Sequence, residues 1–385
     1  MDLGYTAGEL AFRDELREWL ATEVPKLPDE PPREDWTARR EFDTSWQRKL
    51  FDAGFAGIDW PKAYGGRGGT PTEQLIFLEE TTRAGAPYVG VNFVGLLHAG
   101  PTLAAEASDE QREEHLPRIL RGEEVWCQGF SEPGAGSDLA SLRTKAVRDG
   151  DHYVVNGSKI WTSFAQVADY CELLVRTDAP KADGKKHRGI TWLICPMSLD
   201  GIEVRPLKTI QGSSEFSEVF FNDVRVPVGN RVGDENDGWR VAMVTFSFER
   251  GTAFVSELLD TMQLLKRLVA LCKDNGRWDD AGVRRDLAHL SCDLDALWAL
   301  TKRNVTQAER SGVPGPGGSV FKLHYSEVRH KLGDLALRVL DQMTLDGEAE
   351  EHIRGWMHAM SITIAAGTSQ IQRNILSERV LGMPR

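Results

Sequence analysis

"DHYVVNGSKIWTS" (residues 151–163) is the stretch that decides the fold class. Asn156 and Gly157 stand between two runs rich in β-branched and aromatic residues, and an Asn-Gly pair in that position indicates a turn between strands. Further short runs of the same kind follow, separated by turn residues, at 171–177, 189–196, 201–207 and 217–227. The segment 123–229 is therefore predicted to be a compact all-β domain.

On both sides of this segment the apolar residues have helical spacing. Phe12, Leu16 and Leu20 recur every four residues, which is typical of one face of a helix. Further helices are predicted over 37–54, 71–84 and 108–121, and long helical periods return after 236 with a Gly- and Pro-rich linker at 311–319. We predict an N-terminal α-helical domain at 1–122, a middle β-barrel or sandwich domain at 123–229, and a C-terminal four-helix bundle domain at 230–385.

A glycine-rich loop, "GGRGG" at 65–69, precedes the predicted helix 71–84. Thr70 or Thr72 can cap that helix, because a threonine hydroxyl accepts a hydrogen bond from the first turn. A phosphate-binding loop is the alternative reading of the glycines. The segment lacks the GxxxxGK[ST] pattern of such a loop, and no strand precedes it, so we predict that it only connects two helices.

The bulk composition disfavours several classes of protein. A net charge of −12 and a pI near 5.3, without a run of Lys and Arg, disfavour nucleic-acid binding, because the phosphate backbone attracts clustered cations. The five cysteines are far apart and show no CxxC or Cys/His spacing, so we predict neither disulfides nor a metal site and favour a reducing cytoplasm. The charged N-terminus, and the lack of an apolar stretch of about 18 residues, predict no signal peptide and no transmembrane span.

Two stretches of the predicted β domain could hold a ligand. "FSEPGAGSDLASLRT" (130–144) places Pro and Gly between polar groups, so its backbone can approach a flat or phosphorylated ligand, with Ser131 and Ser137 supplying hydroxyls. An ordinary surface turn is the alternative. "KIWTSFAQ" puts Trp161 beside two hydroxyls at the end of a strand, where a tryptophan belongs either to the core or to the wall of a cofactor site.

A third stretch, "DGWRVAMVTFSFERGTAFV", has the spacing of a helix. Ala242, Phe246 and Ala253 fall on one stripe, and Glu249 lies on the same stripe. A carboxylate on an apolar helix face costs free energy unless it is paired, hydrogen-bonded or neutralised. Either an ion pair with an arginine, Arg250 or another, explains its position, or Glu249 is a general base whose pKa is raised by burial.

Six motifs, in order, resemble the acyl-CoA dehydrogenase family. They are "SEPGAGSD", "IWTS", "FNDVRVP", "GDENDGW", the "ER" pair at 249–250 and "GTSQIQRN" near the end of the chain. The resemblance covers essentially the whole length, and the helices–β–helices layout agrees with that family's fold. It implies an acyl-CoA dehydrogenase-like fold, an FAD cofactor, and the flavin-dependent conversion of an acyl-CoA thioester, in lipid or steroid catabolism, to a trans-2-enoyl-CoA.

The resemblance also assigns residues to the cofactor and the substrate. The residues implied to contact FAD are Gln128, Phe130, Ser131, Gly136, Trp161, Ser163, Thr368 and Gln370. Ser137 and Arg250 are implied to bind the CoA part of the substrate. In the family reaction a carboxylate removes the α-proton and the β-hydrogen leaves as hydride to flavin N5, while hydrogen bonds polarise the thioester carbonyl.

The position of the base departs from the commonest family pattern. Most members carry a Glu just before the terminal Gly-Thr, where this chain has Ala366. A minority, resembling isovaleryl- and long-chain acyl-CoA dehydrogenases, hold the base on a helix before an Arg, and Glu249 occupies that place. The small Ala366 leaves room for such a carboxylate, and its backbone N–H remains as the donor to the thioester carbonyl that the family uses. The resemblance therefore implies Glu249 as the base.

Two further departures concern assembly. Family members usually carry Arg-x-x-Phe-Gly and Gln-x-x-Gly-Gly segments that reach the ADP half of a neighbouring subunit's FAD. Here "CKDNGRWDDAGVRRD" (272–286) and "DQMTLDGEAEE" (341–351) break both patterns. Bacterial sterol side-chain dehydrogenases of the family form α2β2 heterotetramers with half the usual flavin, and the chain resembles their flavin- and base-bearing subunit.

The resemblance implies an electron-transfer flavoprotein as electron acceptor and a tetramer, possibly α2β2 with a homologous chain. Two alternatives from other classes stay open at this point: a non-catalytic or partner-dependent acyl-CoA-binding subunit, and an acyl-CoA oxidase. The acyl chain of the substrate, whether straight, branched or sterol-derived, cannot be read from the residues.

Overall fold

The computed structural model describes residues 4–87, 89–179, 186–249, 254–311, 317–340 and 349–384. These residues form two compact units. The helical unit contains the described residues within 1–20, 70–86 and 250–385, and the sheet unit contains those within 21–69 and 87–249.

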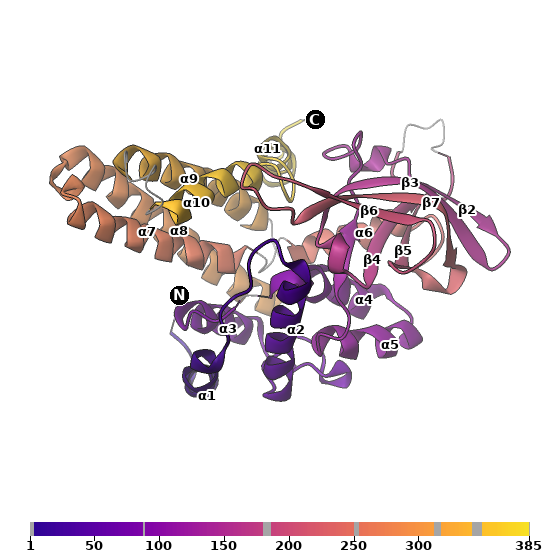
Figure 1. Cartoon of the computed structure of the whole chain (residues 1–385), viewed down its shortest axis with the longest axis horizontal. Helices are drawn as coiled ribbons and strands as arrows, with labels where there is room; N and C mark the ends of the chain where they lie inside the picture. The colour runs from indigo at the N-terminus through magenta and orange to yellow at the C-terminus, as the bar shows by residue number, and fades with distance from the viewer. Residues whose placement is uncertain are drawn as a thin grey trace. The chain divides into compact units, whose positions relative to one another are not determined.

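The sheet unit is built on one eight-stranded sheet of described residues, in the order β6-β7-β3-β2-β4-β5-β8, with β1 paired to β4 (Figure 1). Its strands are β1 (Trp126–Gly129), β2 (Lys145–Asp149), β3 (His152–Ser163), β4 (Tyr170–Arg176), β5 (Ile190–Pro196), β6 (Ile202–Leu207), β7 (Phe216–Pro227) and β8 (Arg231–Val232). Its helices are α2 (Trp36–Asp52), α4 (Gly100–Glu106), α5 (Asp109–Leu120) and α6 (Gly238–Glu249). The predicted middle β region and the helices predicted at 37–54 and 108–121 are confirmed.

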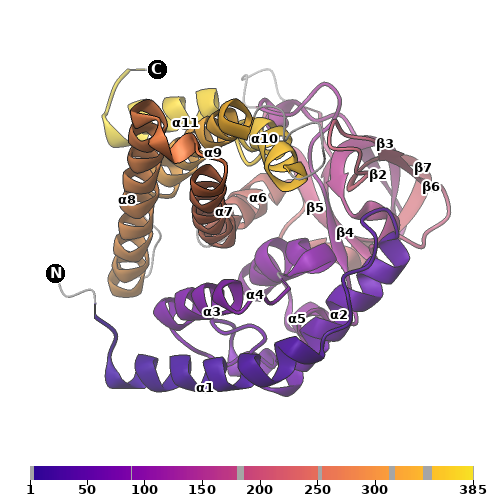
Figure 2. The ribbon, with the colours of Figure 1, turned by 60° about the vertical axis from the view of Figure 1, so that its left-hand side comes forward.

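The helical unit contains the long helices of the C-terminal part of the chain, and α7, α8, α9 and α10 lie side by side (Figure 2). Its helices are α1 (Ala7–Glu23, which continues into the sheet unit), α3 (Pro71–Arg83), α7 (Val255–Asp274), α8 (Ala281–Ser311), α9 (Gly317–Leu340), α10 (Glu350–Ile362) and α11 (Ser369–Ile375). Leu268, Leu294 and Leu332 belong to the apolar core between them. The predicted linker at 311–319 is shorter than expected, because α8 reaches Ser311 and α9 begins at Gly317, while 312–316 lie outside the described residues.

Thr70, one of the two predicted caps, begins α3. Its Oγ1 accepts a hydrogen bond from Glu73 N at 3.1 Å, and Glu73 Oε2 accepts one from Thr70 N at 2.8 Å. This reciprocal pair satisfies two N–H groups that the first helical turn leaves without intrahelical partners. Thr72 instead donates to Glu309 on α8 at 2.7 Å, so the cap is Thr70.

The turn predicted at Asn156-Gly157 is wrong. Residues 152–163 form one continuous strand, β3, and the pair lies at a bulge against β7. Gly157 has φ 150°, and a Cβ there would lie 2.7 Å from Thr144 Cα, so close packing requires glycine. Asn156 donates from its side chain to Asp223 Oδ1 at 2.9 Å and holds the bulge across the strands. The chain reverses earlier, at Gly150, whose φ of 61° is left-handed.

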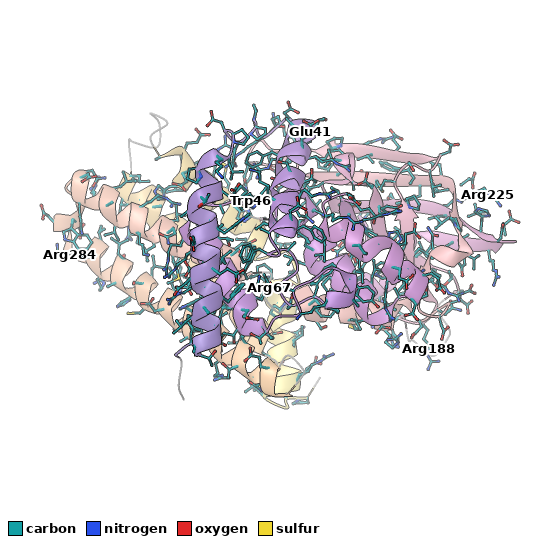
Figure 3. All side chains as sticks on the ribbon, turned by 90° about the horizontal axis from the view of Figure 1, so that it is seen from below. Glu41, Trp46, Arg67, Arg188, Arg225 and Arg284 are labelled. Carbon is teal, nitrogen blue, oxygen red and sulfur yellow. The ribbon has the colours of Figure 1, made fainter. Side chains whose placement is uncertain are left out.

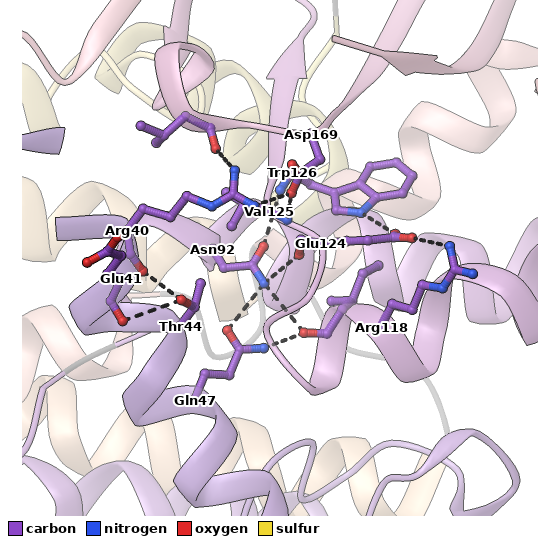
Figure 4. A network of polar contacts seen from close by, with 12 residues as sticks. Arg40, Glu41, Thr44, Gln47, Asn92, Arg118, Glu124, Val125, Trp126 and Asp169 are labelled. Atoms are coloured by element: carbon purple, nitrogen blue, oxygen red, sulfur yellow. Dashed lines mark hydrogen bonds and ion pairs between the residues drawn. The ribbon is translucent and has the colours of Figure 1, made fainter. Parts of the chain in front are cut away.

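A buried polar network fixes the start of β1, the strand that carries Gln128. Asn92 is fully buried; its Nδ2 donates to Gln47 Oε1 at 3.2 Å and to the Glu124 carbonyl at 3.0 Å, and its Oδ1 accepts from Trp126 N at 3.2 Å. These contacts converge around the beginning of the strand (Figure 4). Buried amides that use both ends in this way specify one arrangement of the chain.

Charged side chains extend from the surface of each unit, among them Arg188 and Arg225 of the sheet unit and Arg284 of the helical unit (Figure 3). In the part of the chain that the structure describes, no helix is long and apolar enough to cross a membrane. No group of three or more His, Cys, Asp or Glu side chains within the same ranges has the geometry to hold a metal ion.

Candidate active site

Gln128 lies on β1, and two buried side chains, Glu172 and His98, contact its amide nitrogen. Gln128 Nε2 donates to Glu172 Oε1 at 2.8 Å, and Glu172 is fully buried directly opposite on β4. His98 Nδ1 lies 3.4 Å from the same nitrogen. Burial lowers the pKa of His98 to about 4, so the imidazole is neutral at physiological pH.

The segment after β1 presents an open glycine and two hydroxyls. Phe130 is 3% exposed and packs edge-to-face on Phe246 of α6, with ring centroids 5.8 Å apart. Ser131 is half-buried, and its carbonyl accepts a hydrogen bond from Ile160 N at 2.9 Å. Ser137 is exposed, and a Cβ added to Gly136 would meet no atom within 4 Å. The glycine therefore leaves its backbone accessible to a ligand.

Trp161 is not a core residue. Its side chain is 58% exposed, and its φ of 61° puts a bulky residue in the left-handed region. That conformation costs about 1–3 kcal/mol and occurs mostly where function requires it. A β-bulge between Lys159 and Thr162 allows the ring to turn outward, and it rests edge-on against Phe216 at 6.0 Å. An exposed ring held in this way offers a flat apolar surface to a ligand.

Two hydroxyls follow Trp161 on β3. Thr162 is buried, and its Oγ1 has no hydrogen-bond partner among the described residues. Ser163 is half-buried opposite Phe216 on β7. The sheet unit therefore brings together Gln128, Phe130 and Ser131, from the end of β1, with Trp161 and Ser163 at the end of β3, because Ile160 N bonds directly to Ser131 O.

Glu249 is the last residue of α6. Val241, Ala242 and Thr245 form the fully buried face of this helix, and Thr245 Oγ1 accepts from Thr102 Oγ1 at 2.9 Å. The side chain of Glu249 lies outside the described residues, as do Arg250 and Ala253. The choice between an ion pair and a general base therefore stays a prediction.

The predicted carbonyl donor lies in a tight turn of the helical unit, between α10 and α11. Ala366 and Gly367 have φ values of 52° and 87°. Lys322 Nζ, which is buried, donates to Gly367 O at 2.6 Å, and Gln372 Nε2 donates to Ala366 O at 3.0 Å. Among the described residues, none accepts a hydrogen bond from the Ala366 N–H.

The remaining two predicted flavin contacts lie just after this turn. Thr368 is the N-cap of α11, and its Oγ1 accepts a hydrogen bond from Ile371 N at 3.2 Å. The hydroxyl hydrogen of Thr368 can still be donated to another acceptor, because the cap uses only the oxygen. Gln370 is exposed on the first turn of the same helix.

Sequence reasoning missed four buried polar residues beneath these positions: His98, Glu132, Lys159 and Glu172. Lys159 had a detectable signal. The period of two in β3 puts Tyr153, Val155 and Lys159 on the same face, so a lysine stands where the pattern requires a core residue. Glu132 showed no signal, because its partner is distant in the sequence.

Comparison with known proteins gives a consistent result. Three family models match successive parts of the chain: acyl-CoA dehydrogenase N-terminal domain over 6–123, middle domain over 127–224 and C-terminal domain over 236–381. The acyl-CoA dehydrogenase IpdE1 of Mycobacterium tuberculosis is 39% identical over 386 residues, 97% of each chain. The acyl-CoA dehydrogenase FadE26 of the same species is 35% identical and covers 100% of this chain and 99% of its own.

Two solved structures agree along their whole length. One is described as the Tcur3481-Tcur3483 steroid ACAD, with a TM-score of 0.85, 32% identity and full coverage of both chains. The other is the ChsE4-ChsE5 complex from Mycobacterium tuberculosis, with a TM-score of 0.83, 34% identity and full coverage of both chains.

Proposed function

This chain belongs to the acyl-CoA dehydrogenase family, as an FAD-dependent member, and from that premise we propose that it desaturates a steroid-derived acyl-CoA with Glu249 as the base. Membership of the family rests on the three matching family models and on the 39% identity with IpdE1 over 97% of the chain. The substrate class is supported by the similarity to a structure described as a steroid ACAD. Electron-transfer flavoprotein is the proposed acceptor, and the cytoplasm the proposed location.

The described residues of the sheet unit fit a flavin. The observation that supports this most strongly is the exposed, left-handed Trp161, since a flat aromatic cofactor would cover its face. Ser131 and Ser163 flank it with hydroxyl groups, and the accessible backbone at Gly136 suits a close approach. Bound FAD would supply the hydride acceptor of the reaction.

The chain's own residues would carry the proton chemistry. A thioester α-proton is weakly acidic, so the carbonyl oxygen must be stabilised as negative charge develops on it. The Ala366 N–H is the proposed donor, in a turn whose carbonyls are already held by Lys322 and Gln372. Glu249 would accept the α-proton, and Ser137 and Arg250 would bind the CoA part.

Replacing Glu249 by Gln tests the base. In anaerobic mixing with a panel of straight, branched and sterol-derived acyl-CoAs, the wild type should bleach the flavin with the sterol-derived thioester. The variant should retain FAD and near-normal acyl-CoA affinity but reduce the flavin several orders of magnitude more slowly, because the base acts in the transition state.

Asp237→Asn is a matched control. Asp237 lies just before the same helix, α6, and its carboxylate pairs with Arg240 on the surface. It should behave as wild type. An unchanged bleaching rate in the Glu249 variant would exclude this residue as the base. No bleaching of the wild type by any thioester would favour a non-catalytic subunit, whereas rapid reoxidation by O2 would favour an oxidase.

We also propose that the chain works in a heteromer with a homologous subunit. The broken segments at 272–286 and 341–351 support this, since they replace the residues that reach a neighbouring FAD in the usual family pattern. The similarity to the ChsE4-ChsE5 complex supports it further.

A further inference from the structure

A buried ion pair lies beneath the proposed flavin surface of the sheet unit. Lys159 is fully buried on β3, and its Nζ donates to Glu132 Oε1 at 2.8 Å. Glu132 is 8% exposed, and its carboxylate also accepts from the backbone N–H groups of Arg143 and Thr144, at 2.6 and 2.8 Å. The carboxylate is therefore fully engaged by three donors.

Stability alone does not explain this pair. Desolvating two charges costs several kcal/mol, and replacing a buried pair by apolar residues is often neutral or stabilising. Burial would raise the pKa of Glu132, but the ammonium of Lys159 and the N–H of Thr144 outweigh it, and the pKa is lowered. Burial lowers the pKa of Lys159, and the Glu132 carboxylate only partly offsets that effect. An amine and a carboxylate held 2.8 Å apart in the interior therefore call for a role other than core packing.

The contacts of Lys159 show what the pair holds in place. Besides Glu132, Lys159 Nζ donates to the Phe130 carbonyl at 3.1 Å, and the next residue, Ile160, donates its N–H to the Ser131 carbonyl at 2.9 Å. Two successive residues of β3 therefore hold two successive carbonyls of the loop. One residue further along β3 stands Trp161.

Glu132 secures the other side of the same loop. Its own N–H and carbonyl bond to Ala135 O and N at 3.2 and 2.9 Å, which closes a tight turn. Its side chain ties that turn to the segment entering β2 through Arg143 N and Thr144 N. The loop cannot shift relative to β3 without breaking charge-assisted hydrogen bonds.

We propose that Lys159 and Glu132 are positioning residues for the cofactor, which fix the Ser131 hydroxyl and the Trp161 ring in one mutual geometry. The inference rests on the proposed function, which makes Ser131 and Trp161 contacts of the flavin. The pair itself does not touch the cofactor. Its effect is therefore expected in the affinity and the environment of the flavin.

The test uses the FAD-bearing assembly with Lys159→Met and with the double variant Lys159→Met, Glu132→Gln, which removes the pair without leaving a buried charge. In both variants the loop that carries Ser131 loses a charge-assisted hydrogen bond. We expect FAD affinity to fall by up to roughly tenfold to hundredfold, which corresponds to the full contribution of such a bond. The visible circular dichroism of the flavin at saturating FAD should also change. The double variant should melt closer to the wild-type temperature than Lys159→Met alone, because it leaves no unpaired buried charge.

Arg225→Met is the matched control. Arg225 of β7 and Asp149 of β2 form an ion pair of the same 2.8 Å length across β3, but both side chains are more than half exposed, and Arg225 lies at the opposite end of β7 from Phe216. It should leave the FAD affinity and the flavin dichroism unchanged. A double variant with wild-type FAD affinity and dichroism would overturn the inference.

Trp161→Ala separates this inference from its premise. If Trp161→Ala weakens FAD binding and the Lys159 variants do not, the proposed flavin surface stands and the positioning role falls. If Trp161→Ala leaves FAD binding and dichroism unchanged, the proposed flavin surface itself is wrong, and the positioning role falls with it.

Discussion

His98 is a buried imidazole beside Gln128, and its ionisation makes a prediction at the scale of one residue. Burial lowers its pKa from 6.5 to about 4. As the pH falls below 6.5, the unfolded chain binds a proton that the folded chain resists until about pH 4. The stability that His98 contributes is therefore complete above pH 6.5 and is lost as the pH falls from 6.5 to 4.

Urea unfolding of the wild type and of His98→Gln at two pH values measures this contribution. Between about pH 7.5 and pH 5 the wild type should lose about 2 kcal/mol more stability than the variant. The difference between the two proteins cancels the other titrating groups. A difference of opposite sign would show that Glu172, whose Oε1 lies 3.9 Å from His98 Nδ1, keeps a proton on the imidazole.

Single residues differ in how much of their role the sequence could predict. Thr70 was predictable as a cap, because a threonine followed by Pro71 and by Glu73 at the third position is a local signal. The exposure of Trp161 was not, because it depends on a bulge that only the pairing of β3 with β7 creates. Local chemistry is readable from neighbours in the chain, whereas exposure is set by distant strands.

At the scale of elements, the turn between α10 and α11 is held by two buried side-chain donors, Lys322 of α9 and Gln372 of α11. Lys322→Met removes the ammonium that binds the Gly367 carbonyl. If this turn places the Ala366 N–H for the thioester carbonyl, kcat should fall roughly tenfold to hundredfold while FAD stays bound, since a charge-assisted hydrogen bond is worth about 1.5–3 kcal/mol. KM should change less than kcat.

Lys331→Met provides the control, because Lys331 is exposed on the same helix, α9. It should retain wild-type kcat and FAD content. Gln372→Met, which removes the donor to the Ala366 carbonyl, should resemble the Lys322 variant. A Lys322 variant with a lower melting temperature but unchanged kcat would mean that the turn does not position a catalytic donor.

Strand pairing shows why some elements escaped sequence-based prediction. The Asn156-Gly157 pair has the composition of a hairpin turn, yet long-range pairing with β7 keeps the strand continuous, and the pair faces a bulge in β7 at Asn222 and Asp223. Cys127, Cys171 and Cys195 are far apart in the sequence but stand in register on β1, β4 and β5. Burial raises the pKa of the Cys127 and Cys195 thiols, so they behave as core residues.

At the scale of the whole molecule, composition and periodicity predicted the order helix, β, helix, and the structure confirms it. The grouping of these elements into two units was harder to predict from the sequence. Residues 70–86, which include α3, belong with the C-terminal helices to the helical unit, whereas α2 and α5 belong to the sheet unit. Leu75 and Leu78 of α3 share an apolar cluster with Val255 and Leu259 of α7. The domain boundaries at 122/123 and 229/230 stay a prediction.

The FAD content of this chain is expected to depend on its assembly with a homologous subunit. Expressed alone, the chain should purify with little FAD, and co-expression with a homologous family member should give a yellow complex with half the usual flavin content. The proposed flavin contacts secure one end of the cofactor, whereas the pyrophosphate and adenine need donors that 272–286 does not present in the usual family pattern. In that segment Arg284 already donates to the Trp278 carbonyl, and Arg277 is exposed.

Flavin absorbance per chain and the mass in solution measure the outcome. A homotetramer purified alone with one tightly held FAD per chain would contradict the proposal and would make Arg277 and Arg284 the residues to replace next.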